Sequence, residues 1–124
     1  MLLGHLGLLV VADGMAGHRY GELASAISIK TLREFYESEE LHRLLRQQFK
    51  RAKRAALVPR SFPFEQYKLQ RALEEANVAI HTAAERNPQY ETMGTTIVAA
   101  VVAEHSLFVG HVGDSRIYRY RRGK

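Results

Sequence analysis

The chain has 124 residues, of which 46% are hydrophobic and 25% are charged, and its formal net charge is +5. This length suits one ordinary domain or part of a larger one, and the composition is typical of a globular protein. The sequence contains no cysteine. Disulfides, thiolate zinc sites and cysteine nucleophiles are therefore excluded, and the composition is compatible with the cytoplasm, where we expect the protein to be.

The positive charge is concentrated in two segments. No acidic residue lies between Leu41 and Phe64, a stretch with seven basic residues: Arg43, Arg46, Lys50, Arg51, Lys53, Arg54 and Arg60. A second cluster near the end of the chain contains Arg116, Arg119, Arg121, Arg122 and Lys124. Such clusters attract phosphates or nucleic acid, or they form a solvated helix face and a charged strand edge. Because no aromatic and basic recognition motif accompanies them, we expect no nucleic-acid binding.

The segment 1–12 is very apolar, which leaves a signal peptide and a buried strand as alternatives. It has no Lys or Arg, and it leads directly into a glycine-rich turn, which is not typical of a signal peptide. It is also too short to cross a bilayer as a helix. We therefore predict a central strand over 6–12, ended by Asp13-Gly14, and no association with a membrane.

Helical periodicity dominates the middle of the chain. A first helix is predicted from about 20–22 to 37–39, because its apolar residues fall on one face. The apolar residues between 41 and 52 form a second helical stripe, with the basic residues on the other side. Pro63 suits the first turn of a third helix, and Asn87-Pro88 ends that helix.

The last part of the chain has the character of strands. Segments 95–103 and 107–112 are β-branched and apolar, with a short turn over 104–106. Gly113-Asp114 then makes a tight turn or bulge before a third strand over 115–121, in which apolar and aromatic residues alternate with arginines. One strand, then helices, then an antiparallel meander predicts an α+β fold.

Asp13 and Asp114 are the only aspartates, and each follows an apolar stretch beside a glycine. A carboxylate at a strand end suits a hard cation such as Mg²⁺ or Mn²⁺, which takes oxygen ligands. Asp13 in that position can bridge two ions, and Gly14 lets a main-chain carbonyl approach without a Cβ in the way. The alternatives are an ordinary Asp-Gly turn at Asp13, and at Asp114 a bulged hairpin with the carboxylate bonded to local amides or to Arg116.

Two histidines are further candidates as proton donors or ligands. His18 lies in a glycine-rich loop, where bonding to the backbone is the alternative. His111 lies in an apolar strand, where a hydrogen-bonded core histidine is the more common outcome. No Ser-His-Asp arrangement is indicated, because the sequence has no nucleophile elbow.

Together these segments resemble the bacterial form of the metal-dependent protein serine/threonine phosphatases, the PPM class. The matching segments are 11–18 (Val-Ala-Asp-Gly-Met-Ala-Gly-His), 21–25 (Gly-Glu-Leu-Ala-Ser), 93–96 (Met-Gly-Thr-Thr) and 113–118 (Gly-Asp-Ser-Arg-Ile-Tyr). The resemblance covers nearly the whole chain. One departure is Ala16, at a position where the bacterial pattern usually has glycine.

The resemblance implies part of a β-sandwich flanked by antiparallel helix pairs, with one helix layer, from about 21 to 86, over strands of both sheets. It also implies a signalling enzyme that hydrolyses phosphoserine and phosphothreonine in proteins at a two-metal centre with Mg²⁺ or Mn²⁺, where a metal-bridging water attacks phosphorus in line. Asp13 would bridge the two ions, the Gly14 carbonyl would bind one of them, and Asp114 would belong to an additional, weaker metal site. Some relatives have a histidine proton donor where this chain has Met15, so no catalytic residue is assigned.

The chain departs from the family in length. A family domain is about twice as long, and its upstream arginine and acidic motif and its C-terminal Asp-Gly and Asp-Asn motifs have no counterpart in 1–124. We therefore expect 1–124 to be the amino-terminal-to-middle part of a phosphatase domain, inactive alone because two carboxylates cannot complete two metal spheres. The alternative is a non-catalytic phosphatase-like module that docks an acidic protein partner through the basic stretch from Arg43 to Arg60.

Overall fold

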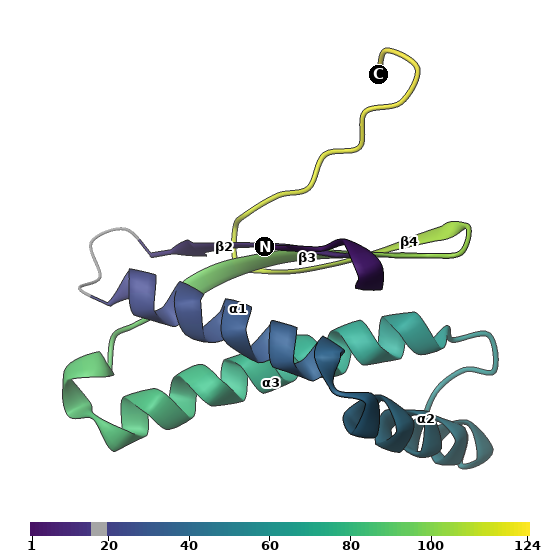
Figure 1. Cartoon of the computed structure of the whole chain (residues 1–124), viewed down its shortest axis with the longest axis horizontal. Helices are drawn as coiled ribbons and strands as arrows, with labels where there is room; N and C mark the ends of the chain where they lie inside the picture. Colours follow the sequence, from purple (N-terminus) through teal and green to yellow (C-terminus); the bar gives the residue numbers. More distant parts are fainter. Residues whose placement is uncertain (16–19) are drawn as a thin grey trace.

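One antiparallel sheet and one layer of helices make up the fold of residues 1–15 and 20–124, the parts that the computed structural model describes (Figure 1). The strands are β1 (Leu2–Leu3), β2 (Leu8–Gly14), β3 (Thr95–Ala103) and β4 (Ser106–Val112), and they are ordered β1-β2-β3-β4 across the sheet. The helices are α1 (Gly21–Glu37), α2 (Glu39–Arg54) and α3 (Phe64–Arg86), with short 3-10 turns η1 (Gly4–Leu6) and η2 (Pro88–Tyr90). The α+β class and the three predicted helices are confirmed.

The two central strands, β2 and β3, have one buried face and one open face. Leu8 and Val10 of β2 are fully buried against the helices, whereas Leu9 and Val11 between and after them are exposed on the opposite face. This is the period-two alternation of a sheet that is covered on one side. The register pairs Asp13 at the end of β2 with Thr96 at the start of β3, so the two motifs of the sequence meet at one end of the sheet.

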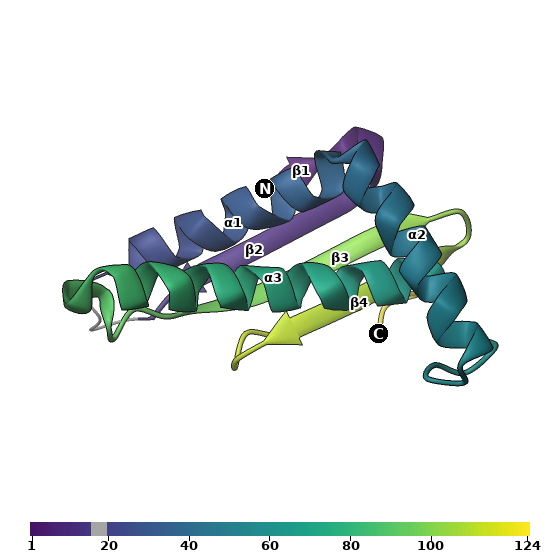
Figure 2. The same ribbon diagram turned by 90° about the horizontal axis from the view of Figure 1, so that it is seen from below.

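Helices α1 and α3 run antiparallel and cover the buried face of the sheet, as Figure 2 shows. The core between the layers is apolar and includes Leu8, Val10, Leu32, Phe35, Leu69, Ala72, Ala76, Ile97, Ala99 and Val101. Burial of these side chains is the main source of stability, because each large apolar side chain removed from water contributes about 1.5–3 kcal/mol. In the parts of the chain that the structure describes, no helix is both long and apolar enough to span a bilayer.

Helix α2 crosses the far end of this layer (Figure 2) and buries only Leu45 and Phe49. Its start is capped by Ser38, whose side-chain oxygen accepts a hydrogen bond from the Leu41 N–H at 3.1 Å. Glutamates occupy the first turn, and three basic residues occupy the last turn. This charge order stabilises the helix dipole at both ends, so α2 is stabilised locally and needs little contact with the core.

The open face of the sheet carries large apolar side chains. Val11 is 66% exposed, Leu107 is 58% exposed, and Leu2, Leu9, Val102 and Val109 lie on the same face. No helix or strand from 1–15 or 20–124 covers this face; the C-terminal segment leaves the sheet on that side and extends away from it (Figure 1).

Two predictions about strands are wrong. All four strands described form one sheet, so the helices do not cover strands from two sheets, and residues 115–121 form no strand. Gly113, with φ +93°, turns the chain away from the sheet, and the backbone hydrogen bonds of the tail that lie outside helices and strands join only Arg121 and Lys124. The alternation over 115–121 was compatible with a strand, but a strand exists only where a neighbouring backbone pairs with it.

Candidate metal centre

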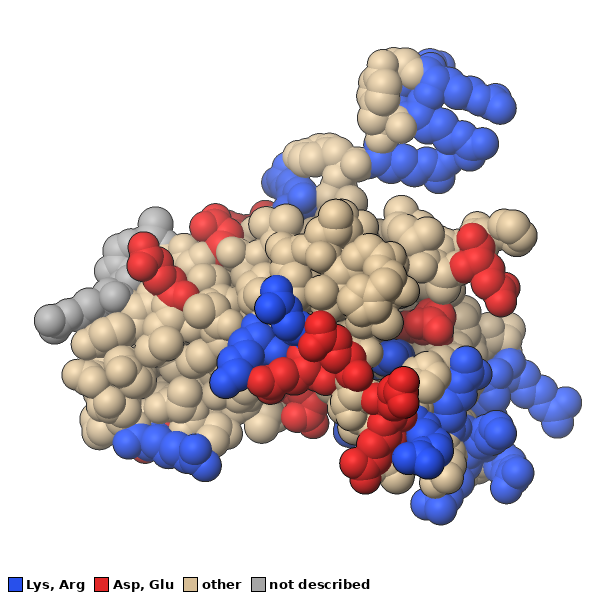
Figure 3. Space-filling view, in the orientation of Figure 1, with Lys and Arg blue, Asp and Glu red and all other residues tan. Residues whose placement is uncertain are grey.

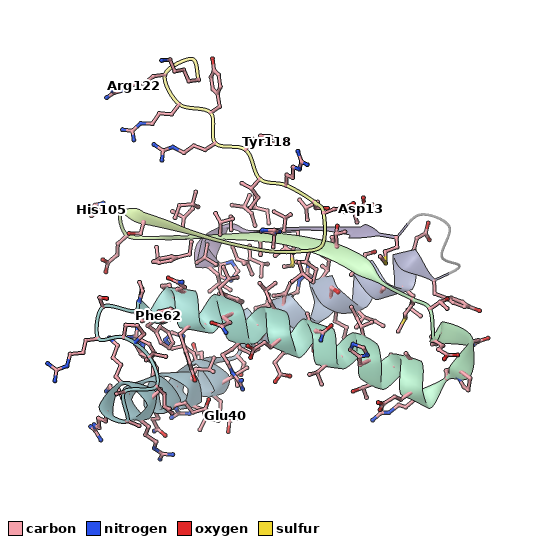
Figure 4. All side chains as sticks on the ribbon, turned by 180° about the vertical axis from the view of Figure 1, so that it is seen from behind. Asp13, Glu40, Phe62, His105, Tyr118 and Arg122 are labelled. Carbon is pink, nitrogen blue, oxygen red and sulfur yellow. The ribbon has the colours of Figure 1, made fainter. Side chains whose placement is uncertain are left out.

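Asp13 lies at the end of β2, on the open face of the sheet, with its side chain exposed. Its position is fixed by the β2–β3 ladder, because Asp13 is paired with Thr96 and the Thr96 hydroxyl donates a hydrogen bond to the Asp13 main-chain oxygen at 3.5 Å. The carboxylate is therefore held on a rigid strand while its own oxygens remain accessible. Figure 4 shows Asp13 at the end of the sheet from which the C-terminal tail departs.

The main-chain carbonyl of Gly14 points away from β3. The Met15 N–H donates to the Gly94 oxygen at 3.1 Å, which makes Met15 and Gly94 a hydrogen-bonded pair of the antiparallel ladder. Hydrogen-bonded and non-hydrogen-bonded pairs alternate along such a ladder, so the neighbouring pair of Gly14 and Thr95 is of the non-bonded kind. The Gly14 oxygen is therefore directed to the outer side of β2, where the pairing among the described residues ends at Val10: β1 pairs with Leu8 and Leu9, and Met1 exchanges two hydrogen bonds with Val10.

A very close approach of backbones explains why glycine occupies position 14. A Cβ built on Gly14 would lie 2.4 Å from the carbonyl carbon and oxygen of Gly21, the first residue of α1. A Cβ on Gly21 would in turn lie 3.1 Å from the Gly14 carbonyl carbon. The absence of both side chains lets the start of α1 pack directly on the end of β2, next to Asp13.

Asp114 is brought to the same end of the sheet by the turn after β4. Gly113 adopts φ +93° there, with its α-carbon against the Thr96 side chain. The hydroxyl of Ser115 forms a short hydrogen bond with the hydroxyl of Thr96, the residue paired with Asp13. Thr96 thus contacts both the main chain of Asp13 and Ser115, the residue after Asp114, although the two aspartates lie 101 positions apart in the sequence. In the sequence, Thr96 belongs to a β-branched strand and to the family-matching segment 93–96, and neither pattern indicates this contact.

The donor atoms fit a hard divalent cation in kind but not in number. Two exposed carboxylates and one outward carbonyl are the oxygen ligands that Mg²⁺ and Mn²⁺ take. Within the described ranges, however, no group of three or more His, Asp or Glu side chains is arranged to hold an ion. Two octahedral ions need about twelve ligands, so water and further protein groups would have to supply the rest.

The two histidines named as candidates do not complete this set. His18, like Ala16, lies outside the described residues. His111 is exposed on the open face of β4, opposite Val98, so the expectation of a core histidine was wrong. It lines a hollow of about 500 Å³ between α3 and β4, which neither aspartate lines. The strand pattern could not show that this face of β4 is uncovered.

The geometry can be compared with known proteins. The sequence pattern of the family described as Protein phosphatase 2C matches residues 3–124. This chain belongs to the protein phosphatase 2C family. A serine/threonine protein phosphatase from Mycobacterium tuberculosis, PstP, is 35% identical over 117 residues, which are 94% of this chain and 19% of PstP. The serine/threonine phosphatase stp of Listeria innocua is 33% identical over 111 residues, which are 90% of this chain and 37% of stp.

A solved structure supports the family fold. The crystal structure of the catalytic domain of PstP in complex with two manganese ions matches with a TM-score of 0.67 and 34% identity, and the match covers 94% of this chain and 42% of that one. The chain therefore spans only about a fifth to two fifths of the relatives that it matches. The protein phosphatase 2C fold is shared over this part, including both segments that carry the aspartates.

Proposed function

We propose that residues 1–124 supply part of the metal centre of a protein serine/threonine phosphatase, as the amino-terminal-to-middle portion of its catalytic domain. In this proposal Asp13 bridges two Mg²⁺ or Mn²⁺ ions, the Gly14 carbonyl binds one of them, and Asp114 serves an accessory site. The observation that carries the proposal is that Thr96, at one end of the sheet, pairs with Asp13 and bonds to Ser115, the residue after Asp114, in a chain of the protein phosphatase 2C family. The two relatives are serine/threonine phosphatases, which supports phosphoserine and phosphothreonine in proteins as the substrates.

The residues of the chain contribute position and charge. The β2–β3 ladder fixes the backbone of Asp13 and directs the Gly14 carbonyl outward, so only the Asp13 side chain needs to be ordered when an ion binds. When bound, the two ions would activate a water and neutralise charge on the phosphoryl oxygens. Met15, which follows Gly14 and is 48% exposed, has a thioether that cannot donate a proton. The proton for the leaving group must therefore come from another residue or from water.

The number of ligands predicts that the chain alone does not turn over substrate. Asp13 as a bridge and the Gly14 carbonyl would fill about three of the roughly twelve ligand positions of two octahedral ions, and Asp114 would serve the accessory site. Among the described residues no group of three or more His, Asp or Glu side chains is arranged to supply the rest. The signalling role and the cytoplasmic location of the whole protein remain predictions.

Metal binding and hydrolysis by the purified 124-residue chain test the proposal. We expect calorimetry to detect Mn²⁺ binding that is at least tenfold weaker in Asp13→Asn, because the variant keeps the shape of the side chain but loses its charge. Glu104→Gln is the matched control, since Glu104 is an exposed acid in the turn at the opposite end of β3. Hydrolysis of p-nitrophenyl phosphate with Mn²⁺ should be undetectable for all three proteins.

Two outcomes would contradict parts of this proposal. Equal Mn²⁺ affinity in Asp13→Asn and in the unchanged chain would show that Asp13 is not a ligand. Turnover that depends on Asp13 in the 124-residue chain would show that this part of the domain is sufficient for catalysis.

A second candidate function is a non-catalytic module that binds an acidic protein partner. The observation that favours it is the row of exposed basic residues on α2, among them Arg43, Lys50 and Arg54. Binding of divalent ions separates the two candidates, because a module without catalysis does not need tight Mn²⁺ binding at Asp13.

A further inference from the structure

The outer face of α2 carries positive charge that takes part in no ion pair of the described residues, and the acids of the helix, Glu39 and Glu40, are confined to its first turn. Figure 3 shows basic side chains gathered over α2, at the end of the molecule far from the start of α1. The exposed members of this basic face are Arg43, Arg46, Lys50, Arg51, Arg54 and, in the loop that follows, Arg60. Within residues 1–15 and 20–124 the ion pairs are Lys30–Glu34 and Arg71–Glu74, and neither involves α2.

The basic residues of α2 form an ordered stripe. Arg43, Arg46, Lys50 and Arg54 follow one another at intervals of three, four and four residues, which places them along one side of the helix. At 1.5 Å per residue the stripe is about 16 Å long. The Arg46 guanidinium stacks on the Phe64 ring at 4.1 Å from its centroid, so its position is fixed while its charge stays available.

Exposed leucines accompany the stripe. Leu44 is 47% exposed one position after Arg43, which places it about 100° around α2 from that residue, and Leu57 is 78% exposed in the loop that leads to Arg60. Apolar side chains that flank a row of cations fit a ligand that is itself both acidic and apolar. A nucleic acid would use the cations but not the leucines. Of the aromatic side chains at this helix, Phe49 and Phe64 are buried and Tyr67, which contacts Phe49, is partly buried, so no fully exposed ring among them is available to stack on bases.

We propose that the basic face of α2 docks an acidic peptide segment that carries apolar residues, and that this segment belongs to the phosphoprotein substrate. The second part rests on the proposed function. The start of α1 packs on Gly14 and its end leads directly into α2, so docking surface and candidate metal centre are separated by the length of α1. For the 17 residues of α1 this length is about 25 Å.

This distance sets how many residues must lie between the phosphorylated residue and the acidic segment in a substrate that binds at the metal centre and the docking surface together. An extended peptide covers about 3.3–3.6 Å per residue, so at least about eight residues must lie between the phosphorylated residue and the acidic segment. A flexible linker has a root-mean-square length of about 5–6 Å times the square root of its residue number, which matches 25 Å at about 20 residues. Simultaneous binding should therefore be strongest near that length.

The docking surface is tested without metal or hydrolysis. We expect fluorescence anisotropy in EDTA to detect binding of a labelled Glu-rich peptide with two leucines to the 124-residue chain, weakening as salt increases. The variant Arg43→Gln, Lys50→Gln, Arg54→Gln should bind at least tenfold more weakly, because glutamine preserves helix propensity and removes charge. The matched control removes the same charge from the tail, as Arg116→Gln, Arg119→Gln, Arg122→Gln, and should bind within twofold of the unchanged chain.

Additional measurements make each outcome decisive. Circular dichroism confirms that both triple variants fold, and the double variant Arg43→Gln, Arg54→Gln replaces the first if it does not. Leu44→Ser with Leu57→Ser should weaken binding severalfold. Equal losses in the two triple variants would show a response to net charge alone and would overturn the docking surface. Tighter binding of a DNA duplex or RNA than of the peptide would assign this face to nucleic acid instead.

The link to the substrate is tested with peptides that join phosphoserine to the acidic segment through Gly-Ser linkers of 4, 12, 20 and 40 residues, lengths chosen around about 20. We expect Mn²⁺ to increase affinity for the 12- and 20-residue linkers but not for the 4-residue linker. The gain should disappear in Asp13→Asn and in the α2 triple variant. Peptide binding in EDTA with no Mn²⁺-dependent gain at any length would retain the surface but overturn its role in substrate docking. Loss of peptide binding in EDTA, with Asp13-dependent Mn²⁺ binding intact, would overturn the docking surface alone.

Discussion

Gly14 and Gly21 lie in direct backbone contact, and this contact joins the end of β2 to the start of α1. A Cβ on Gly14 would lie 2.4 Å from the Gly21 carbonyl group, which is closer than any real side chain approaches a backbone. On the strand side of this contact lie the two proposed ligands, the carboxylate of Asp13 and the outward carbonyl of Gly14. The packing of a helix on a strand end therefore acts together with the β2–β3 ladder to determine where these oxygens lie.

Gly14→Ala should destabilise the protein and weaken Mn²⁺ binding together. The new methyl group must displace the backbone of Gly21 or of β2, and overpacking of this kind costs about 1–3 kcal/mol. Urea unfolding measures the free energy of unfolding, and calorimetry measures Mn²⁺ affinity. Gly4→Ala is the control, because a Cβ on Gly4 meets no atom within 4 Å. Similar stability and Mn²⁺ affinity in the two variants would show that the Gly14–Gly21 contact is not required.

Gly113→Ala should also reduce stability, through two separable effects. The backbone there has φ +93°, and a Cβ would lie 2.8 Å from the Thr96 methyl carbon. Gly123→Ala has the first effect alone, since Gly123 has φ +79° with nothing within 4 Å. We expect Gly113→Ala to cost about 1–3 kcal/mol more than Gly123→Ala in urea unfolding. Adding Thr96→Ser, which removes the methyl group, should restore part of the loss; no restoration would mean that the clash with Thr96 is not the cause.

Local patterns in the sequence predicted most of the elements. Apolar periodicity, the proline before α3 and the Asn87-Pro88 stop all act within a few residues, and the structure has a helix at each predicted place. The strand predicted over 6–12 was found for the same reason, although β2 begins and ends two residues later, at Leu8 and Gly14. The family, too, was evident from short segments, because its motifs are local.

Contacts between distant segments could not be predicted in the same way. The hydrogen bond of Ser115 with Thr96 depends on the register of β3 and β4 and on the positive φ of Gly113. The exposure of His111 depends on which face of β4 the helices cover, and the missing strand over 115–121 depends on a partner strand. The metal-binding roles of Asp13, Gly14 and Asp114 remain predictions, since they require ligands beyond those that the register brings together.

Tyr36→Phe should stabilise the protein or leave its stability unchanged. The Tyr36 hydroxyl is buried and has no hydrogen-bond partner in the described part of the chain, so its removal eliminates an uncompensated polar group. The same environment raises the pKa of Tyr36, first through burial and then through Glu65. Phenylalanine keeps the ring that the Lys68 ammonium contacts at 4.6 Å. We expect a gain of up to about 1 kcal/mol in the free energy of unfolding measured with urea.

Tyr118→Phe is the control for this prediction and should have no effect, because Tyr118 is 80% exposed. A loss of stability in Tyr36→Phe but not in Tyr118→Phe would reveal a hydrogen-bond partner for the Tyr36 hydroxyl.

Stability should decrease as the pH falls below about 6.5, the usual pKa of histidine, and His42 should account for part of this decrease. Burial first, and then Lys68 and Arg46, lower the pKa of His42, while Glu65 opposes them. The imidazole Nδ1 lies 3.0 Å from the Lys68 ammonium, which can donate a hydrogen bond only to a neutral ring. As the pH falls, the unfolded chain therefore binds a proton on His42 at a higher pH than the folded chain does. The contribution of His42 to stability is lost between about pH 6.5 and the lowered pKa of the folded state, and it is constant below that pKa.

Thermal unfolding at pH 7.5, 6.5 and 5.5 tests this dependence. We expect His42→Gln to lose less melting temperature over this range than the unchanged chain, because glutamine accepts the Lys68 hydrogen bond without titrating. His105→Gln is the control, since His105 is exposed in the turn between β3 and β4. If His42→Gln and the unchanged chain lose the same melting temperature, the pH dependence arises from other groups and the contact with Lys68 does not control it.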